Sequence, residues 1–97
     1  MATDTEVMAA VKRKLNITWE DEGTEARVGD VVASVTPRLN SLLGNDADHE
    51  FGSGDASWGL FLNGCLYEFS DAWDDFTTNY EREIQSVRLL GMANAQA

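Results

Sequence analysis

Hydrophobic residues recur at steps of three and four along most of this chain, the spacing that places side chains on one face of an α-helix. The longest such run lies between residues 24 and 43. Its apolar positions are Val28, Val31, Val32, Val35, Leu39, Leu42 and Leu43. We expect this helix to begin at Gly23 or Thr24 and to end at Gly44, because glycine commonly follows the last helical residue. Pro37 removes a backbone donor, so we also expect a bend there.

A shorter amphipathic run opens the chain. Its apolar positions are Val7, Met8, Val11 and Leu15, which predicts a first helix over residues 4–15. Three consecutive bases occupy residues 12–14, at the end of this helix. Positive charge there complements the helix dipole, which is a sufficient explanation without a nucleic-acid partner.

The second half of the chain carries most of the aromatic residues, again at helical spacing. The stripe consists of Leu62, Leu66, Phe69, Trp73, Phe76 and Tyr80, widened by Trp58, Phe61 and Cys65. Polar and acidic residues stand between these positions, so the opposite face is acidic. We expect this helix to end near residues 77–79 and a new helix to start at Asn79 and run to Leu90, because Thr and Asn favour helix starts. One continuous helix to Leu90 is the alternative.

The patterns together predict an all-α fold, a small bundle of about four helices. With 97 residues, 43% hydrophobic and 25% charged, the chain is typical of one soluble globular domain covering residues 1–97. We expect residues 92–97 to form a flexible tail. The predicted core consists of Val28, Val32, Val35, Leu39, Leu62, Leu66, Phe69 and Trp73, and an aspartate in place of Leu66 should unfold the domain.

Residues 45–57 form the one long loop, which is rich in acids and glycine. Asp46, Asp48 and Glu50 alternate as at the start of a calcium-binding loop. The match fails at Phe51, where the turn glycine belongs, and at Ser57, where the closing carboxylate belongs. We therefore expect a loop that holds no metal and that is either solvated and mobile or ordered only by a neighbour.

Composition narrows the function. Seventeen acidic residues against seven basic ones give a net charge of −10. This charge argues against a protein that binds nucleic acid through the phosphates. The simplest explanation of the charge is solubility. The chain has no apolar run long enough for a membrane span. Near Met1 it also has no basic segment followed by an apolar one, so we expect no signal peptide. We expect synthesis in a reducing cytosol. Cys65 then acts as a small buried hydrophobic residue.

Enzymatic motifs are missing from the sequence. The single histidine, His49, lies in the acidic loop, and nothing positions a nucleophile beside it. No phosphate-binding loop, metal-spaced cysteine pair or metalloprotease motif occurs. We therefore expect no enzyme, no cofactor and no catalytic or metal-binding residue.

Several stretches together suggest a family. A first helix ends in Leu15-Asn16-Ile17, an amphipathic helix and a variable loop follow, and the end of the chain has the form Leu-x-x-Phe-x-x-Asn-Tyr-x-x-Glu-Ile-x-x-Val-Arg, with tryptophan in place of the first leucine. The matching positions are Phe76, Asn79, Tyr80, Glu83, Ile84 and Arg88. This arrangement resembles the head-tail connector (adaptor) proteins of tailed bacteriophages. Pro37 and the acidic loop depart from the family pattern.

The resemblance implies a structural protein of the virion neck, present in the host cytoplasm before assembly. Such a protein forms a ring, usually of twelve copies (a dodecamer), beneath the portal protein, where it extends the DNA channel and offers a platform to stopper or tail proteins. DNA would pass through the channel without sequence-specific binding. An acidic surface fits this role, because it repels the duplex.

We expect the contacts between proteins to lie at the C-terminal element, where an apolar stripe continues beyond the needs of a four-helix core. The candidate interface residues are Phe76, Tyr80, Arg82, Ile84, Val87, Arg88 and Leu90. Two other functions stay open. One is an acidic DNA mimic that inhibits a nucleic-acid enzyme through residues 20–22 and the acids between Glu68 and Asp75, and the other is a generic helical interaction module.

Overall fold

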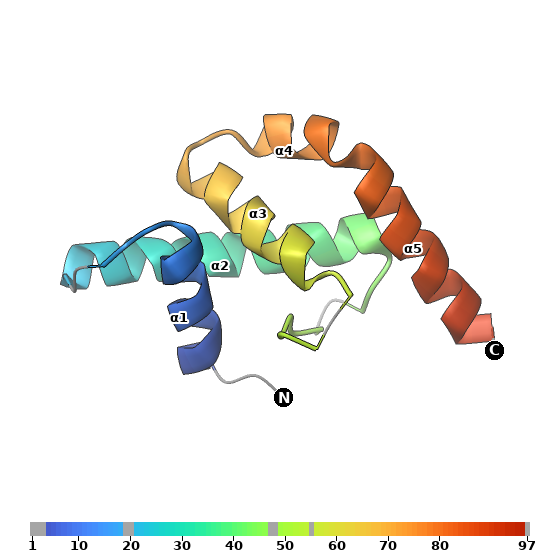
Figure 1. Cartoon of the computed structure of the whole chain (residues 1–97), viewed down its shortest axis with the longest axis horizontal. Helices are drawn as coiled ribbons and strands as arrows, with labels where there is room; N and C mark the ends of the chain where they lie inside the picture. Colours follow the sequence, from blue (N-terminus) through green and yellow to red (C-terminus); the bar gives the residue numbers. More distant parts are fainter. Residues whose placement is uncertain (1–3, 19–20, 47–48, 55, 97) are drawn as a thin grey trace.

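The computed structural model describes residues 4–18, 21–46, 49–54 and 56–96, and within these residues the fold is all-helical. Figure 1 shows α2 running along the length of the molecule, with α3 crossing it and α5 leading away from the body. The third helix packs against α1, α2 and α4, while α2 also contacts α1 and α5. The five helices of the described part are α1 (Asp4–Lys14), α2 (Glu22–Leu43), α3 (Trp58–Phe69), α4 (Trp73–Asn79) and α5 (Glu81–Gln96).

The long second helix confirms the predicted end at Gly44 and begins slightly earlier than expected. Asp21 caps its start, because the Asp21 carboxylate accepts a hydrogen bond from the Thr24 backbone N–H at 3.0 Å. Gly44 adopts the left-handed conformation, with φ 75°. Pro37 lies inside α2 and does not split it. Because Pro37 is exposed, its ring faces solvent.

The predicted aromatic helix is divided, which corrects the single stripe inferred from the sequence. It stops at Phe69, and Asp71 turns the chain with φ 58°. The Ala72 N–H donates to the Tyr67 carbonyl at 2.8 Å and the Asp71 N–H to the Glu68 carbonyl at 3.0 Å. This pair of hydrogen bonds is a Schellman motif, which satisfies the last carbonyls of a helix. Residues 70–72 therefore form a corner between α3 and α4.

A second junction lies at Tyr80, close to the predicted one. The fourth helix ends at Asn79 and α5 begins at Glu81, so the alternative of one continuous helix is wrong. The fifth helix also continues to Gln96, past the residue at which we expected a tail to begin.

The core sits where α3 crosses α2, and it matches the prediction better on α2 than on α3. Val28, Val35 and Leu39 are fully buried. On α3 the buried positions are Leu60, Phe61, Gly64 and Cys65. The predicted core residues that are only partly buried are Val32, Leu62, Leu66, Phe69 and Trp73.

Gly64 explains this rotation of α3. A Cβ atom at this position would stand 3.3 Å from Trp73 Cζ3 and 3.4 Å from Val35 Cγ1. The missing side chain lets the backbone of α3 approach α2 and α4 closely, so the glycine side of α3 turns inward. Leu66 lies outside the buried cluster, and the expectation that Leu66→Asp unfolds the domain loses its basis.

The acidic loop is anchored to the body, contrary to the expectation of a solvated, mobile segment. Phe51 is 3% exposed, and its ring stacks on Phe61 with centroids 5.0 Å apart. The buried Asn40 side chain donates to the His49 carbonyl at 2.9 Å. Among the described residues no cluster of His, Cys, Asp and Glu could hold a metal ion; Asp48 of the calcium-like pattern lies outside them.

Candidate functional site

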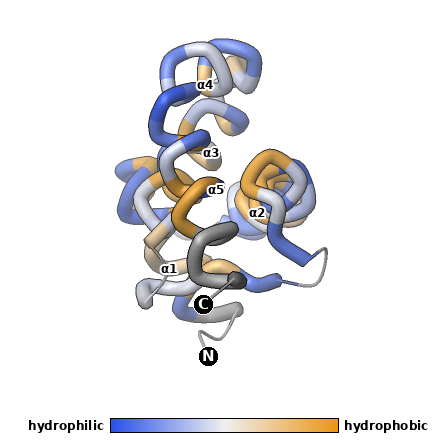
Figure 2. The backbone as a smooth tube through the Cα atoms, turned by 90° about the vertical axis from the view of Figure 1, so that its right-hand side faces the viewer, coloured by the Kyte–Doolittle hydropathy of each residue, from blue (hydrophilic) through white to orange (hydrophobic). Residues whose placement is uncertain are grey.

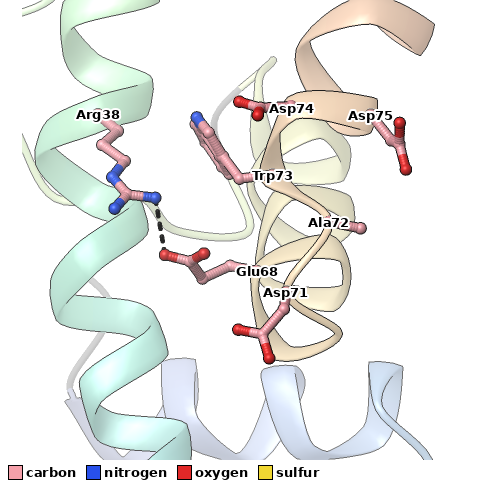
Figure 3. A pocket seen from close by; sticks show the side chains of 7 residues that line it. All are labelled: Arg38, Glu68, Asp71, Ala72, Trp73, Asp74 and Asp75. Atoms are coloured by element: carbon pink, nitrogen blue, oxygen red, sulfur yellow. Dashed lines mark hydrogen bonds and ion pairs between the residues drawn. The ribbon is translucent and has the colours of Figure 1, made fainter.

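A hollow of about 510 Å³ opens between α2 and the α3–α4 corner (Figure 3). Arg38 lines it from α2 and is hydrogen-bonded to Glu68 from α3. Trp73, the first residue of α4, lies beside the Arg38 side chain. The complete lining is Arg38, Glu68, Asp71, Ala72, Trp73, Asp74 and Asp75.

The Arg38 side chain is held in the hollow by Glu68 and Trp73. Its Nη1 donates to Glu68 Oε2 at 2.7 Å, and its guanidinium carbon lies 5.4 Å from the centre of the Trp73 ring. Ser34 Oγ donates to the same Glu68 oxygen at 2.9 Å. Glu68 is thereby neutralised within the chain, and Trp73 is fixed by a cation–π contact.

The rim of the hollow keeps an unbalanced negative charge. Asp71, Asp74 and Asp75 are exposed. In Figure 3 the carboxylates of Asp71 and Asp74 point towards the hollow, whereas Asp75 points away. Two carboxylates therefore face an incoming group at this end.

The hollow continues into an apolar part. A neighbouring depression of about 440 Å³ is lined by Pro37, Arg38, Ser41, Leu42 and Trp73. Arg38 and Trp73 line both depressions, which therefore adjoin, with acidic residues at one end and apolar residues at the other. We call this surface the α2–α4 groove. The helical pattern of the sequence does not predict this surface, because it predicts no turn at residues 70–72.

Two of the seven predicted interface residues are buried inside the chain, and the structure corrects their assignment. Phe76 is 0% exposed and Ile84 is 7% exposed. Phe76 packs against Trp73, with ring centroids 4.9 Å apart, and α5 carries Ile84 back onto α2. The five-helix arrangement uses these residues for its core because α4 and α5 fold back onto the first three helices.

Two further predicted residues are half-buried within the chain, and a third, Arg88, is exposed but lies close to α2. Tyr80 and Val87 are half-buried against the core, and the Tyr80 ring meets Tyr67 edge-on at 5.8 Å. Partial burial raises the pKa of Tyr80, with Tyr67 and Glu83 adding to the effect. Arg88 lies over the C-terminal end of α2, where its Nε would be 3.7 Å from a Cβ at Gly44.

The predicted residues that remain open are Arg82 and Leu90, and the structure adds Leu89. Leu89 is 65% exposed and Leu90 is 57% exposed, and Figure 2 shows a hydrophobic stretch of α5 just before the residues drawn in grey. Arg82 is exposed and has no ion-pair partner among the described side chains. Leu89 could have been found by noting that it lies roughly 140° around the helix from Ile84.

The thiol of Cys65 lies inside the core. Cys65 is the one free cysteine and is 0% exposed. Burial, with a contribution from Glu68, raises the pKa of its thiol to about 12, so it is a poor nucleophile at neutral pH. The helices in the described ranges include none that could cross a membrane.

One member of the acidic array proposed for a DNA mimic is neutralised within the chain, because Arg38 pairs with Glu68. Asp71, Asp74 and Asp75 of the array are exposed, and Glu20 lies outside the described residues. No protein-family model, no curated protein and no solved structure matches the chain.

Proposed function

We propose that this chain is a structural subunit that works by assembly, as a head-tail connector of a tailed bacteriophage. In this proposal copies of the chain form a ring, of twelve subunits by resemblance, between the portal protein and the stopper or tail proteins. Double-stranded DNA passes through the ring without specific binding. The chain supplies contacts and charge, and it carries out no chemistry.

The observation that carries the proposal is a pair of leucines in the middle of α5. Leu89 and Leu90 are the large hydrophobic residues that stand exposed in the described part of the chain, and α5 leads away from the body (Figure 1). Neighbouring exposed leucines on one helix are typical of a contact with another protein. The sequence resemblance then indicates which kind of assembly this contact serves.

The charge of the molecule is compatible with a DNA channel. A net charge of −10 repels phosphates, which would keep DNA moving past the ring instead of adhering to it. The acidic end of the α2–α4 groove suits a basic group from a partner. The chain therefore has one apolar and one acidic feature available for assembly.

The decisive experiment is co-expression with the portal protein encoded in the same genome, followed by size-exclusion chromatography and electron microscopy. We expect the chain to co-elute with the portal and to add a ring of density at one end of it. The control is the double variant Leu89→Ser, Leu90→Ser, which keeps the buried face of α5 and should lose co-elution. Separate elution of the wild-type chain and the portal would contradict the proposal.

A different result would favour the DNA mimic. If the chain elutes apart from the portal but is retained by a basic nucleic-acid-binding protein in a salt-sensitive manner, the connector assignment is wrong and the acidic surface is the functional one. A helical interaction module without a ring would instead bind a partner as a single copy, which the particle mass would show.

A further inference from the structure

We propose that the α2–α4 groove receives the outer face of α5 from a second copy of this chain. This inference rests on the proposed assembly function and specifies how two neighbouring subunits meet. It assigns Arg82 and Leu89 as the inserted residues and Asp74, Leu42 and Trp73 as the residues that receive them.

The outer face of α5 carries one basic residue, Arg82, and one apolar residue, Leu89. Ile84 faces the core, and Arg82 and Leu89 lie on the opposite side of the helix, seven residues apart. Seven residues correspond to about 10 Å along a helix. Leu89 is 65% exposed.

The groove offers an acidic point and an apolar point that complement these two residues of α5. Its acidic end carries Asp74, whose carboxylate points into the hollow in Figure 3, and its apolar end is formed by Pro37 and Leu42. Trp73 lies where the two ends meet. A helix laid along the groove can therefore set an arginine against Asp74 while a leucine covers Leu42 and Trp73, so that charge and hydrophobicity match together.

A second copy can supply the base that the acidic end of the groove requires. The molecule carries a net charge of −10, so two copies repel each other unless their few bases meet acids. In the C-terminal half the bases are Arg82 and Arg88, and Arg88 lies against Gly44 of its own chain. Arg82 is the base that remains for a partner.

This contact joins unlike surfaces. Arg82 and Leu89 are exposed and lie on the side of α5 opposite the buried Ile84, so this face of the helix is open to a neighbouring copy. Each copy can therefore insert its α5 into one neighbour and receive α5 from another. Such a head-to-tail contact generates a closed ring or an open filament, whereas a symmetric pair of identical surfaces stops at a dimer.

Cysteine cross-linking tests which surfaces meet. Copies of the full chain with Leu89→Cys are mixed with tagged copies carrying Leu42→Cys and treated with a mild oxidant. We expect the mixed dimer to be the main product. The matched control replaces Leu42→Cys by Ser53→Cys in the exposed part of the loop. Cys65 does not compete, because it is fully buried.

Two outcomes would overturn the arrangement. A dominant disulfide between two Leu89→Cys copies means that like surfaces meet, and a mixed product no more abundant than the Ser53→Cys control means that α5 and the groove do not meet. If the wild-type chain still forms a ring on the portal in either case, the proposed function stands and this contact is wrong.

Charge reversal tests the polar half of the contact, measured by sedimentation of the full chain. Arg82→Glu and Asp74→Arg should each weaken self-association about tenfold, and the two together should restore it. Asp75→Arg is the control, since Asp75 lies in the same first turn of α4 but points away from the groove. Equal effects of Asp74→Arg and Asp75→Arg, or no restoration in the double variant, would refute the pairing.

Discussion

Asp71 occupies a backbone conformation that side chains other than glycine rarely adopt, with φ 58°. The left-handed region costs an ordinary residue roughly 1–2 kcal/mol, although aspartate and asparagine tolerate it better than most. The end of α1 uses the same device, with Asn16 at φ 60°, and α2 uses Gly44. Two of these three helix ends therefore carry a residue other than the one the geometry prefers.

Replacing Asp71 with glycine should stabilise the fold. We expect the free energy of unfolding to rise by about 0.5–1 kcal/mol, because glycine adopts positive φ without strain. Asp75→Gly is the matched control. It makes the same chemical change inside α4 and should lower stability by about the same amount. Urea denaturation followed by circular dichroism measures both, and a loss of stability in Asp71→Gly would show that its side chain has another structural role.

Arg88 and Arg82 should respond in opposite ways to the same substitution. Arg88 lies over the C-terminal end of α2, where positive charge is favourable, so Arg88→Glu should destabilise the fold by about 1 kcal/mol. Arg82 lies in the first turn of α5, where negative charge interacts favourably with the helix dipole. Arg82→Glu should therefore leave the free energy of unfolding unchanged or slightly higher. Thermal melts at low salt, repeated at high salt to screen the charges, measure both effects. Arg88 is exposed, so its assignment to the interface stays a prediction beside this contribution to folding.

At the scale of elements, Gly64 decides how α3 crosses its neighbours. We expect Gly64→Val to destabilise the fold by roughly 1–3 kcal/mol, because its added atoms meet Val35, Trp73 and Phe76. A Cβ atom added at Gly29 of α2 would meet no atom of the described residues within 4 Å, so Gly29→Ala should stabilise the helix by about 1 kcal/mol. Denaturant midpoints of the two variants should move in opposite directions. A neutral Gly64→Val would mean that α3 can move away from α2 at little cost.

The loop between α2 and α3 should depend on one aromatic residue. Phe51 is 3% exposed and stacks on Phe61, so Phe51→Ala should lower the free energy of unfolding by about 3 kcal/mol. Limited proteolysis should then cut the loop sooner than in the wild-type chain. Glu50→Ala, at an exposed neighbouring position, serves as the control and should change neither measurement.

Elements with long, regular hydrophobic patterns could be predicted from the sequence, whereas corners could not. The helix over α2 is confirmed, as are the all-α class and the end at Gly44, because apolar periodicity and glycine chemistry act locally. The turn at Asp71 escaped prediction because aspartate carries only a weak preference for positive φ. The burial of Phe51 also escaped, since a lone aromatic residue in an acidic loop has no periodic partner.

The same limit applies to the candidate interface. Local spacing identified Leu90 and Arg82 on the open side of α5, but it also selected Phe76 and Ile84, which tertiary packing buries. Periodicity finds an apolar face without revealing whether the partner is another part of the chain or another molecule. The groove arises from two segments 30 residues apart, Arg38 and Glu68, and no local pattern connects them.

At the scale of the whole molecule, α5 has two parts with different tasks. Its first half places Ile84 in the core, and the leucines that follow, Leu89 and Leu90, are exposed to solvent. We expect truncation after Asn79 to lower stability by several kcal/mol, because it uncovers the face of α2 that α5 contacts. Truncation after Arg88 keeps Ile84 and Arg88 and should preserve the fold while removing the exposed leucines. Circular dichroism and light scattering separate the two effects, and a fully stable chain ending at Asn79 would show that α5 is dispensable for folding.

The burial of Cys65 makes its thiol a probe of how often the folded molecule opens transiently. This thiol has no exposed surface, and burial opposes its ionisation. It therefore reacts with an alkylating reagent only while α3 is separated from α2. The labelling rate in excess reagent therefore counts opening events directly. Subunits locked between neighbours in an assembled particle would open less often, and their slower labelling would report how much rigidity each subunit gains from the others.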